Sequence, residues 1–236
     1  MVGYESIAVP RPLDVGSGNM LISASLFAAN SARYGDEIAQ IERGGADYLH
    51  IDVMDGVFVP NLSFGPKILV GIRNASQLLF DVHLMITKPE QYVEVFIDSG
   101  ADAVTVHLEA TNQVRDALHI CRRKNVKFGL AISPQTPLPE IEPYIEDIDI
   151  LLIMSIYPGV GGQQFMPGAV QRIKQAERMR ARYNARYLIS VDGAISASTA
   201  KLCSQAGADV IVAGTSIFAE SDRKAAIKVL RMAADG

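Results

Sequence analysis

Cysteine is scarce in this chain, and its scarcity excludes two kinds of scaffold. Cys121 and Cys203 are the two cysteines among 236 residues, and they stand far apart with no paired spacing. Neither a disulfide framework nor a thiolate metal site is therefore predicted. A chain without disulfides fits a reducing compartment, so a cytoplasmic location is the expectation.

Excess charge and long apolar segments are also missing. The 22 basic residues against 26 acidic ones leave a net charge of -4, which argues against the basic face of a nucleic-acid binder. Residues 1–19 contain proline and glycine but no long apolar core, so they predict neither a signal peptide nor a membrane span. We expect an N-terminal extension at 1–19 and a folded domain at 20–236, with no nucleic-acid or membrane partner.

The remaining pattern is an alternation of short apolar runs with longer amphipathic segments. With 49% hydrophobic residues, the chain can bury the core of one large α/β domain or of two small ones. The apolar runs predict strands at 20–26, 48–53, 79–84, 103–107, 127–132, 148–154, 187–191 and 210–213. Helical patterns lie between them, among others at 32–43, 89–99, 113–124, 169–183, 198–206 and 223–233.

The triplet Gly-Ala-Asp recurs at 45–47, 100–102 and 207–209, each time between a helix and a strand. Glycine after a helix supplies a left-handed cap, so these triplets predict repeated αβ turns. Eight strand-helix pairs without a linker favour a single-domain (β/α)₈ TIM barrel, with a doubly wound open sheet as the alternative. No Gly-x-Gly-x-x-Gly follows the first strand, which counts against a dinucleotide-binding sheet.

Polar side chains gather at the ends of the predicted strands. Alternation places His50, Asp52 and Met54 on one face of an otherwise apolar strand. One buried His-x-Asp pair can be a simple hydrogen-bonded pair. However, His83 ends the third strand and Asp192 the seventh, where a barrel collects its chemistry. Two imidazoles and two carboxylates predict a site for one divalent ion such as zinc, iron, manganese or cobalt.

Two further histidines are left over. His107 also ends a strand, and we interpret it as a group behind the ligands or in the pocket, because four ligands already close a typical site. His119 lies in an amphipathic helix beside Arg122 and Arg123, which indicates a solvated face.

Three groups of residues are candidates for contact with a substrate. The loop after the sixth strand is either a lid with backbone amides that reach a ligand, or a long flexible turn; its candidates are Gly159, Gly161, Gly162 and Gln163. Segments after the seventh and eighth strands occupy the usual phosphate position of barrel enzymes, and their candidates are Gly193, Ala194, Gly214, Thr215 and Ser216. Methionines at strand ends line a pocket or simply pack the barrel; they are Met54, Met85 and Met154.

Taken together, these segments resemble the ribulose-phosphate 3-epimerase family. The matching stretches are HIDVMDG at 50–56 with FVPN at 58–61, DVHLM at 81–85, IMS at 153–155 with PGVGGQ at 158–163, VDG at 191–193 and VAGTSIF at 212–218. The resemblance implies a (β/α)₈ barrel whose single divalent metal is held by His50, Asp52, His83 and Asp192. It also implies that Asp52 and Asp192 are the acid-base pair at the substrate's C3, and that Ser25 and His83 lie against the substrate.

The implied activity is a metal-dependent 3-epimerase that converts D-ribulose 5-phosphate to D-xylulose 5-phosphate through an enediolate. Related enzymes act on allulose 6-phosphate, and such a phosphorylated ketose is the alternative substrate. A homo-oligomer is expected from the resemblance alone.

Several positions depart from the family pattern. The first strand continues as SLFAAN at 25–30, Ser133 precedes Pro134 where asparagine is usual, and Tyr157 stands where smaller or acidic residues are common. Ala194 replaces a second glycine, and its N–H can still donate to a phosphate if the backbone keeps a negative φ.

Two other functions remain open on the same barrel. A decarboxylase or aldolase would recruit a lysine near the strand ends, for which Lys67 and Lys88 are the candidates, although each also suits a solvated helix start. A non-catalytic relic of the family would have no physical need to retain four buried polar groups.

Overall fold

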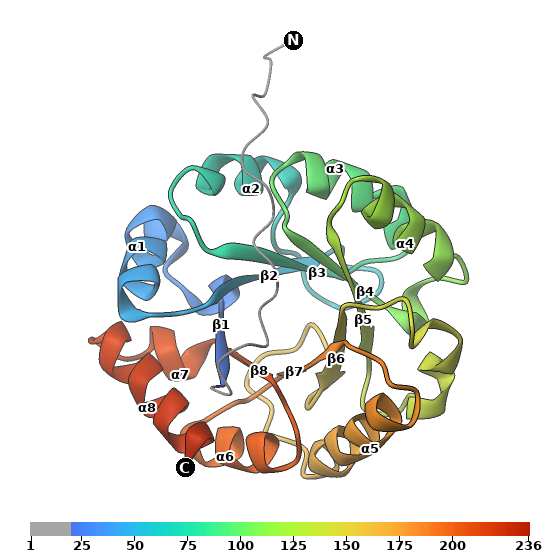
Figure 1. The fold of residues 1–236 in the computed structure, drawn as a ribbon. Helices are drawn as coiled ribbons and strands as arrows, with labels where there is room; N and C mark the ends of the chain where they lie inside the picture. Colours follow the sequence, from blue (N-terminus) through green and yellow to red (C-terminus); the bar gives the residue numbers. More distant parts are fainter. Residues whose placement is uncertain (1–19) are drawn as a thin grey trace.

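A closed barrel of eight parallel strands, ordered β1 to β8 as in the chain, forms the centre of the computed structural model, which describes residues 20–236 (Figure 1). The strands are β1 (Leu21–Ser25), β2 (Tyr48–Met54), β3 (Leu79–Met85), β4 (Ala103–His107), β5 (Lys127–Ile132), β6 (Ile150–Met154), β7 (Leu188–Asp192) and β8 (Val210–Ala213). The predicted (β/α)₈ barrel is confirmed, and the doubly wound sheet is excluded because β8 pairs with β1. The predicted extension at 1–19 lies outside the described residues.

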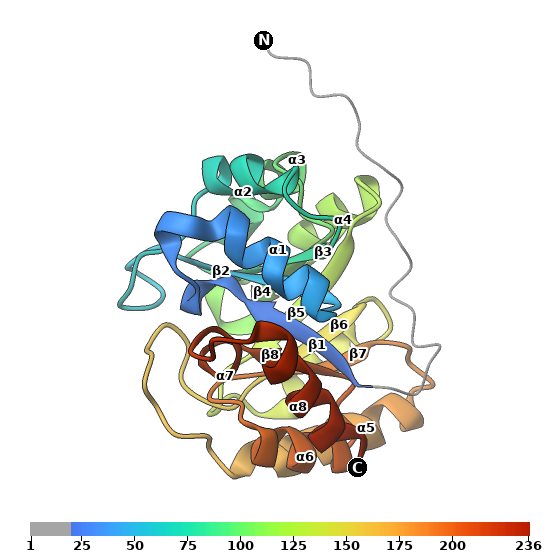
Figure 2. The same ribbon diagram turned by 90° about the vertical axis from the view of Figure 1, so that its left-hand side faces the viewer.

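Helices surround the barrel on its outside (Figures 1 and 2). They are α1 (Tyr34–Gly44), α2 (Pro66–Arg73), α3 (Val93–Asp98), α4 (Val114–Arg123), α5 (Gly168–Arg182), α6 (Ala197–Gln205), α7 (Thr215–Phe218) and α8 (Arg223–Asp235). Short 3₁₀ helices occur at η1 (Leu26–Ala28), η2 (Ser31–Arg33), η3 (Pro89–Gln91), η4 (Leu108–Ala110) and η5 (Leu138–Tyr144). Within residues 20–236, no helix is both long and apolar enough to cross a membrane.

Two connections differ from the regular strand-helix alternation that the sequence predicts. The fifth connection contains only η5, with Pro143 inside it and Pro137 before it, and proline interrupts the N–H pattern of an α-helix. The helix expected from residue 89 begins as η3 after Lys88, whose φ of 53° is left-handed, and α3 starts only at Val93. Strand ends agree to within about two residues, the usual uncertainty of such boundaries.

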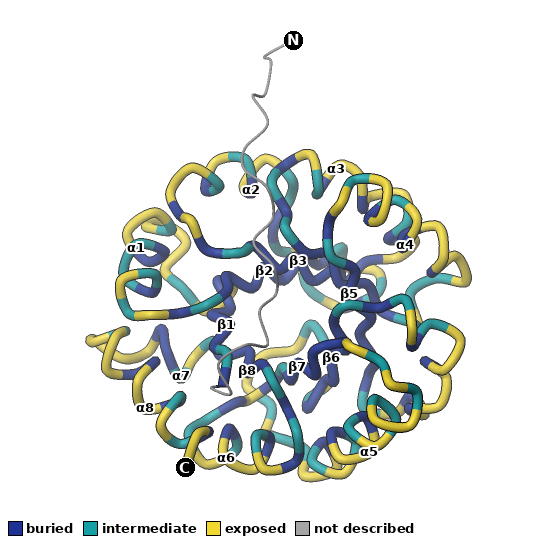
Figure 3. Tube along the Cα trace, viewed as in Figure 1, coloured by how far each residue is buried: buried dark blue, intermediate teal, exposed yellow. Residues whose placement is uncertain are grey.

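The two faces of each strand pack against different parts of the protein. Outward side chains such as Leu49 and Ile51 pack against the helices in the main hydrophobic core. Figure 3 shows this arrangement as a buried ring of strands inside helices that are exposed on their outer faces. Inside the barrel, Tyr48, Leu188 and Val210 form an apolar layer near the amino ends of the strands. Above this layer, toward the carboxyl ends of the strands, the interior of the barrel contains polar side chains.

Candidate active site

Strand register brings the predicted metal ligands together. In the parallel pair β2–β3, Asp52 stands opposite His83, and His50 stands opposite Asp81. Alternation sends all four of these side chains to the same interior face. Asp192, the last residue of β7, reaches the same point from another side of the barrel.

The four predicted ligands form one compact cluster. Ligand atoms of His50, Asp52, His83 and Asp192 all lie within 4.8 Å of one another. His50 Nε2 lies 3.3 Å from Asp52 Oδ1, and His83 Nδ1 lies 3.2 Å from the same oxygen. The distance between His50 Nε2 and His83 Nδ1 is 3.3 Å. Both histidines are fully buried.

The cluster favours positive charge at its centre. Burial alone would lower the pKa of His50, but Asp52 and Asp81 outweigh it and raise that pKa well above its usual value. Burial would raise the pKa of Asp52, but His50 and His83 hold it well below the usual range. Burial, followed by the charge of Asp52, raises the pKa of Asp192 to about 7. A divalent cation that displaces protons from such a site satisfies both carboxylates at once, so the donor set fits a metal.

Burial also keeps the second imidazole of the cluster neutral. Desolvation, together with the neighbouring His107 and His50, lowers the pKa of His83 to about 4 although Asp52 opposes this effect. A neutral imidazole is the form of histidine that binds metals.

The ligands are held from behind by residues to which sequence reasoning assigned no role. Asp81 Oδ2 lies 2.9 Å from His50 Nδ1, and the Thr105 hydroxyl donates to Asp81 Oδ1 at 3.2 Å. Thr105 has room because Gly129 faces it, since a Cβ at Gly129 would lie 2.2 Å from Thr105 Oγ1. Asp81 could have been found from the sequence, because it stands two residues before His83 and therefore on the same strand face.

Hydroxyl groups bind Asp52 at its carboxylate and at its backbone carbonyl. The Ser25 hydroxyl donates to Asp52 Oδ2 at 2.7 Å, so Ser25 lies at the site as the resemblance implied. The Ser63 hydroxyl donates to the Asp52 carbonyl and accepts from the Met54 N–H at 2.9 Å. Ser63 lies too far along the sequence from β2 for a local sequence pattern to predict this contact.

A cavity of about 400 Å³ opens above the cluster. Asp52 and Asp192 both line it, together with most of the predicted contact residues, namely Ser25, Met54, Met85, Met154, Gly159, Gly161, Gly162, Gln163, Gly193, Ala194, Gly214 and Thr215. His83 and Ser216 are absent from its lining. Tyr157, Lys67 and Lys88 are also absent from the lining.

The loop after β6 is braced on itself and on the loop after β2, and both extend from the same end of the barrel (Figure 2). The side-chain amide of Gln163 donates to the carbonyls of Tyr157 and Val160, each at 2.7 Å. Asn61 Nδ2 donates to the Gly159 carbonyl at 3.2 Å. Gly159 has a φ of +79°, and a Cβ there would lie 2.3 Å from Val59 Cβ. Of the two alternatives, these contacts favour an ordered loop over the cavity.

Ala194 follows β7, at the position where the family pattern has a second glycine. Ala194 has a φ of 50°, so the condition of a negative φ, under which its N–H was expected to donate to a phosphate, is not met. The left-handed conformation explains why glycine suits this position, because an alanine there is strained by about 1–2 kcal/mol.

Asp55 accepts hydrogen bonds from the N–H groups of Val57, Phe58 and Thr87, and so shapes the loops after β2 and β3.

Comparison with known proteins decides between the functions that this barrel could serve. The family model described as "Ribulose-phosphate 3 epimerase family" matches residues 21–218. The chain belongs to the ribulose-phosphate 3-epimerase family. It is accordingly an epimerase, an enzyme of the isomerase class that acts in carbohydrate metabolism.

Curated relatives of this epimerase cover most of its length. It is 41% identical over 211 residues to a protein named ribulose-phosphate 3-epimerase from Bacillus subtilis, covering 89% of this chain and 97% of that protein. It is 38% identical over 215 residues to the chloroplastic ribulose-5-phosphate-3-epimerase of Arabidopsis thaliana, covering 90% of this chain and 76% of that protein.

Solved structures with the same fold are more distant in sequence. A crystal structure of KGPDC from Streptococcus mutans has a TM-score of 0.72 at 14% identity, over 91% of this chain and 97% of that one. A 3-hexulose-6-phosphate synthase has a TM-score of 0.65 at 20% identity, over 91% and 99% of the two chains. At these identities the likeness concerns the fold alone.

Proposed function

We propose that this epimerase inverts C3 of a phosphorylated ketose, interconverting D-ribulose 5-phosphate and D-xylulose 5-phosphate, with Asp52 and Asp192 as its acid-base pair. One observation supports this mechanism above all: carboxylates from β2 and β7 line the same cavity with pKa values shifted in opposite directions. Such a divergence is typical of paired acid and base groups. The names of the relatives in Bacillus subtilis and Arabidopsis thaliana support the substrate.

His50, Asp52, His83 and Asp192 would hold one divalent metal ion, with zinc, iron, manganese and cobalt all suited to such ligands. A metal ion held there would supply Lewis-acid polarisation of the substrate's C2 carbonyl. The protein's own part is to keep the His83 imidazole neutral, to orient both imidazoles, and to hold the carboxylates within reach of the substrate.

The two carboxylates would move the protons. A proton on C3 is acidic because it is adjacent to the C2 carbonyl, and an ionised carboxylate can remove it from one face of the sugar. The other carboxyl, while protonated, delivers a proton to the opposite face, so the configuration at C3 is inverted. Ionised Asp52 suits the base and Asp192 the acid, and their roles exchange in the reverse direction. The Ser25 hydroxyl, which donates to Asp52 Oδ2, would keep that carboxylate turned toward the sugar.

The phosphate of the substrate would lie at the loops after β7 and β8. Backbone N–H groups are the expected donors, from Gly193 after β7 and from Gly214 and Thr215 after β8, all of which line the cavity. Ala194 lines the cavity beside them with a left-handed φ, and Ser216 follows Thr215 outside the lining. Binding at this distance from C3 orients the sugar and contributes energy remote from the reaction. Met54, Met85 and Met154 would pack against the carbon chain of the ketose.

The alternative substrates and functions have less support. Tyr157, which could have reshaped the pocket for allulose 6-phosphate, does not line the cavity. A decarboxylase or aldolase would need a lysine at the site, and neither Lys67 nor Lys88 lines the cavity. A homo-oligomer and a cytoplasmic location remain predictions.

A panel of phosphorylated pentuloses and hexuloses, incubated with the enzyme in deuterated solvent, tests reaction and substrate together. Deuterium should appear at C3 of D-ribulose 5-phosphate and D-xylulose 5-phosphate, with both epimers formed. Faster turnover of allulose 6-phosphate would change the substrate assignment. Aldol cleavage of the ketose into two smaller carbonyl compounds, without epimer formation, would contradict the proposed reaction.

A further inference from the structure

Two side chains behind the predicted ligands, the buried His107 and the partly exposed Glu109, form a hydrogen-bonded chain that ends on His83. His83 Nε2 lies 2.9 Å from His107 Nε2, and His107 Nδ1 lies 3.1 Å from Glu109 Oε2. Both histidines are fully buried, and they come from the neighbouring strands β3 and β4 (Figure 1). The other ring nitrogen of His83, Nδ1, faces Asp52 and His50 at 3.2 and 3.3 Å.

The hydrogen-bonded chain begins at Glu109, because one of its carboxylate oxygens already accepts hydrogen bonds from other groups. Oε1 accepts from the backbone N–H of Ser133 at 2.7 Å and from the Thr136 hydroxyl. Oε2 is left to face His107. Despite burial, hydrogen bonds from His107, Thr136 and Ser133 lower the pKa of Glu109 to about 2, so the group is an acceptor on both oxygens.

Arg172 of α5 holds the loop that supplies those donors. Its guanidinium donates to the carbonyls of Ser133, Pro134 and Thr136 at 3.0, 3.2 and 2.6 Å. The backbone N–H of Ser133 therefore has a fixed direction, and it cannot rotate to suit a different partner. The orientation of Glu109 is determined by the fold around it.

The positions of the protons follow from this arrangement. An acceptor-only Glu109 requires that His107 carry its hydrogen on Nδ1, which leaves Nε2 of a neutral His107 as an acceptor. His83 must then donate from Nε2. A neutral His83 consequently directs the lone pair of Nδ1 into the ligand cluster, toward His50 Nε2 at 3.3 Å.

We propose that His107 and Glu109 are positioning residues that fix the tautomer of His83, so that its Nδ1 lone pair is available to a divalent cation. The role of this hydrogen-bonded chain in metal binding rests on the proposed metal site, whereas the tautomer of His83 does not depend on that site. Groups behind a metal-ligating histidine commonly fix its tautomer and orientation in this way.

The variant Glu109→Gln should reverse the direction of the whole chain. Its amide oxygen must stay toward the Ser133 N–H, so the amide NH₂ faces His107 Nδ1. His107 then has to accept at Nδ1 and donate from Nε2. His83 accepts at Nε2 and carries its hydrogen on Nδ1, where a metal would otherwise bind.

Glu37→Gln is the matched control. Glu37 is buried, with an exposed fraction of 7%, and pairs with Arg223 at 3.0 Å between α1 and α8, outside the barrel interior. The change removes the same charge from a glutamate that, like Glu109, is paired through hydrogen bonds, although Glu37 is the more buried of the two. Any effect shared by the two variants reflects stability, and an effect of Glu109→Gln alone reflects the chain to His83.

The first readout is the nitrogen-15 spectrum of the histidines in the metal-free protein, which is tractable because the sequence has four histidines. Parental protein and Glu37→Gln should show His83 protonated on Nε2. Glu109→Gln should show it protonated on Nδ1. Protonation on Nε2 in all three proteins, or on Nδ1 in the parental protein, would overturn the proposal.

The second readout is the affinity for Co²⁺, followed by its visible absorption, and for Zn²⁺ in competition with a chelator. Glu109→Gln should bind both ions about 10–100-fold more weakly, whereas Glu37→Gln should match the parental protein. Equal affinities in all three would overturn the proposal. A parental protein that binds neither ion would instead contradict the metal site of the proposed function, and the tautomer would still be decided by the spectrum.

Discussion

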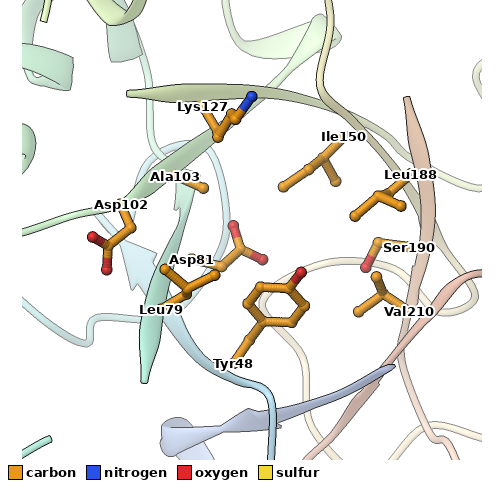
Figure 4. A pocket seen from close by; sticks show the side chains of 10 residues that line it. All are labelled: Tyr48, Leu79, Asp81, Asp102, Ala103, Lys127, Ile150, Leu188, Ser190 and Val210. Atoms are coloured by element: carbon orange, nitrogen blue, oxygen red, sulfur yellow. The ribbon is translucent and has the colours of Figure 1, made fainter. Parts of the chain in front are cut away.

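His50 Nδ1 lies 2.9 Å from Asp81 Oδ2 inside the barrel, on the side of the imidazole away from Asp52. Asp81 lines a small cavity of about 20 Å³. Figure 4 shows its carboxylate beside Tyr48, with Ser190 on the opposite side of that cavity. This partner fixes which nitrogen of His50 faces the ligand cluster. Asp81 and the pair His107–Glu109 therefore contact the imidazoles of His50 and His83 from two different sides.

Replacing Asp81 by asparagine should weaken metal binding. The charge that orients His50 is lost, and such changes behind a ligand typically cost about 10–100-fold in affinity. Competition of the protein with a chelator for Zn²⁺ measures the effect. Ser190→Ala is the control, because Ser190 lines the same small cavity without a hydrogen bond to His50 within the described residues. Equal affinities for the two variants would show that Asp81 does not orient His50.

Asp52→Asn and Asp192→Asn should each reduce exchange of the substrate's C3 proton with deuterated solvent by at least about 10²–10⁴-fold, because each removes one acid-base group. The barrel should remain folded, as judged by circular dichroism. Asp55→Asn is the comparison, since its carboxylate binds loop N–H groups and should leave the exchange rate of bound substrate near the parental value. Parental exchange in either of the first two variants would refute the two-carboxylate mechanism.

Gly159→Ala should raise KM while leaving the barrel stable. Its φ of +79° and the contact of a Cβ with Val59 would push the loop after β6 away from the cavity. Strain of about 1–2 kcal/mol corresponds to a change of about 5–30-fold in the population of the ordered loop. Gly161→Ala is a close control, because its φ is not left-handed and a Cβ there meets nothing within 4 Å. Similar KM values for the two variants would mean that the loop does not contribute to binding.

Both cysteines should resist alkylation in the folded protein. Burial raises the pKa of Cys121 and of Cys203 to about 12, so the reactive thiolate is scarce at pH 8 to 9. In the unfolded chain both thiols return to their usual pKa and react. Because the raised pKa belongs to the folded state, unfolding should become easier as pH rises above about 9. Mass spectrometry after iodoacetamide, with and without urea, measures the difference, and rapid labelling without urea would contradict the burial of these thiols.

Much of this protein is determined by local patterns in its sequence. Alternating residues place His50 and Asp52 on one strand face, and left-handed glycine caps such as Gly45 mark the turns between helices and strands. Because barrel strands are short and regular, the position of Asp192 at a strand end was enough to predict that it meets the other ligands.

Tertiary structure alone decided the remaining features. The pairing of Asp52 with His83 depends on strand register, which relates residues distant in the chain. Ala194 is left-handed, and η5 stands where the regular alternation would place an α-helix. Both features result from the way loops close between neighbouring strands. The chain from Glu109 through His107 to His83 combines two strands with a loop fastened by Arg172. Hydrogen-bond direction is a property of atoms in contact, and the sequence does not specify those contacts until the barrel has closed.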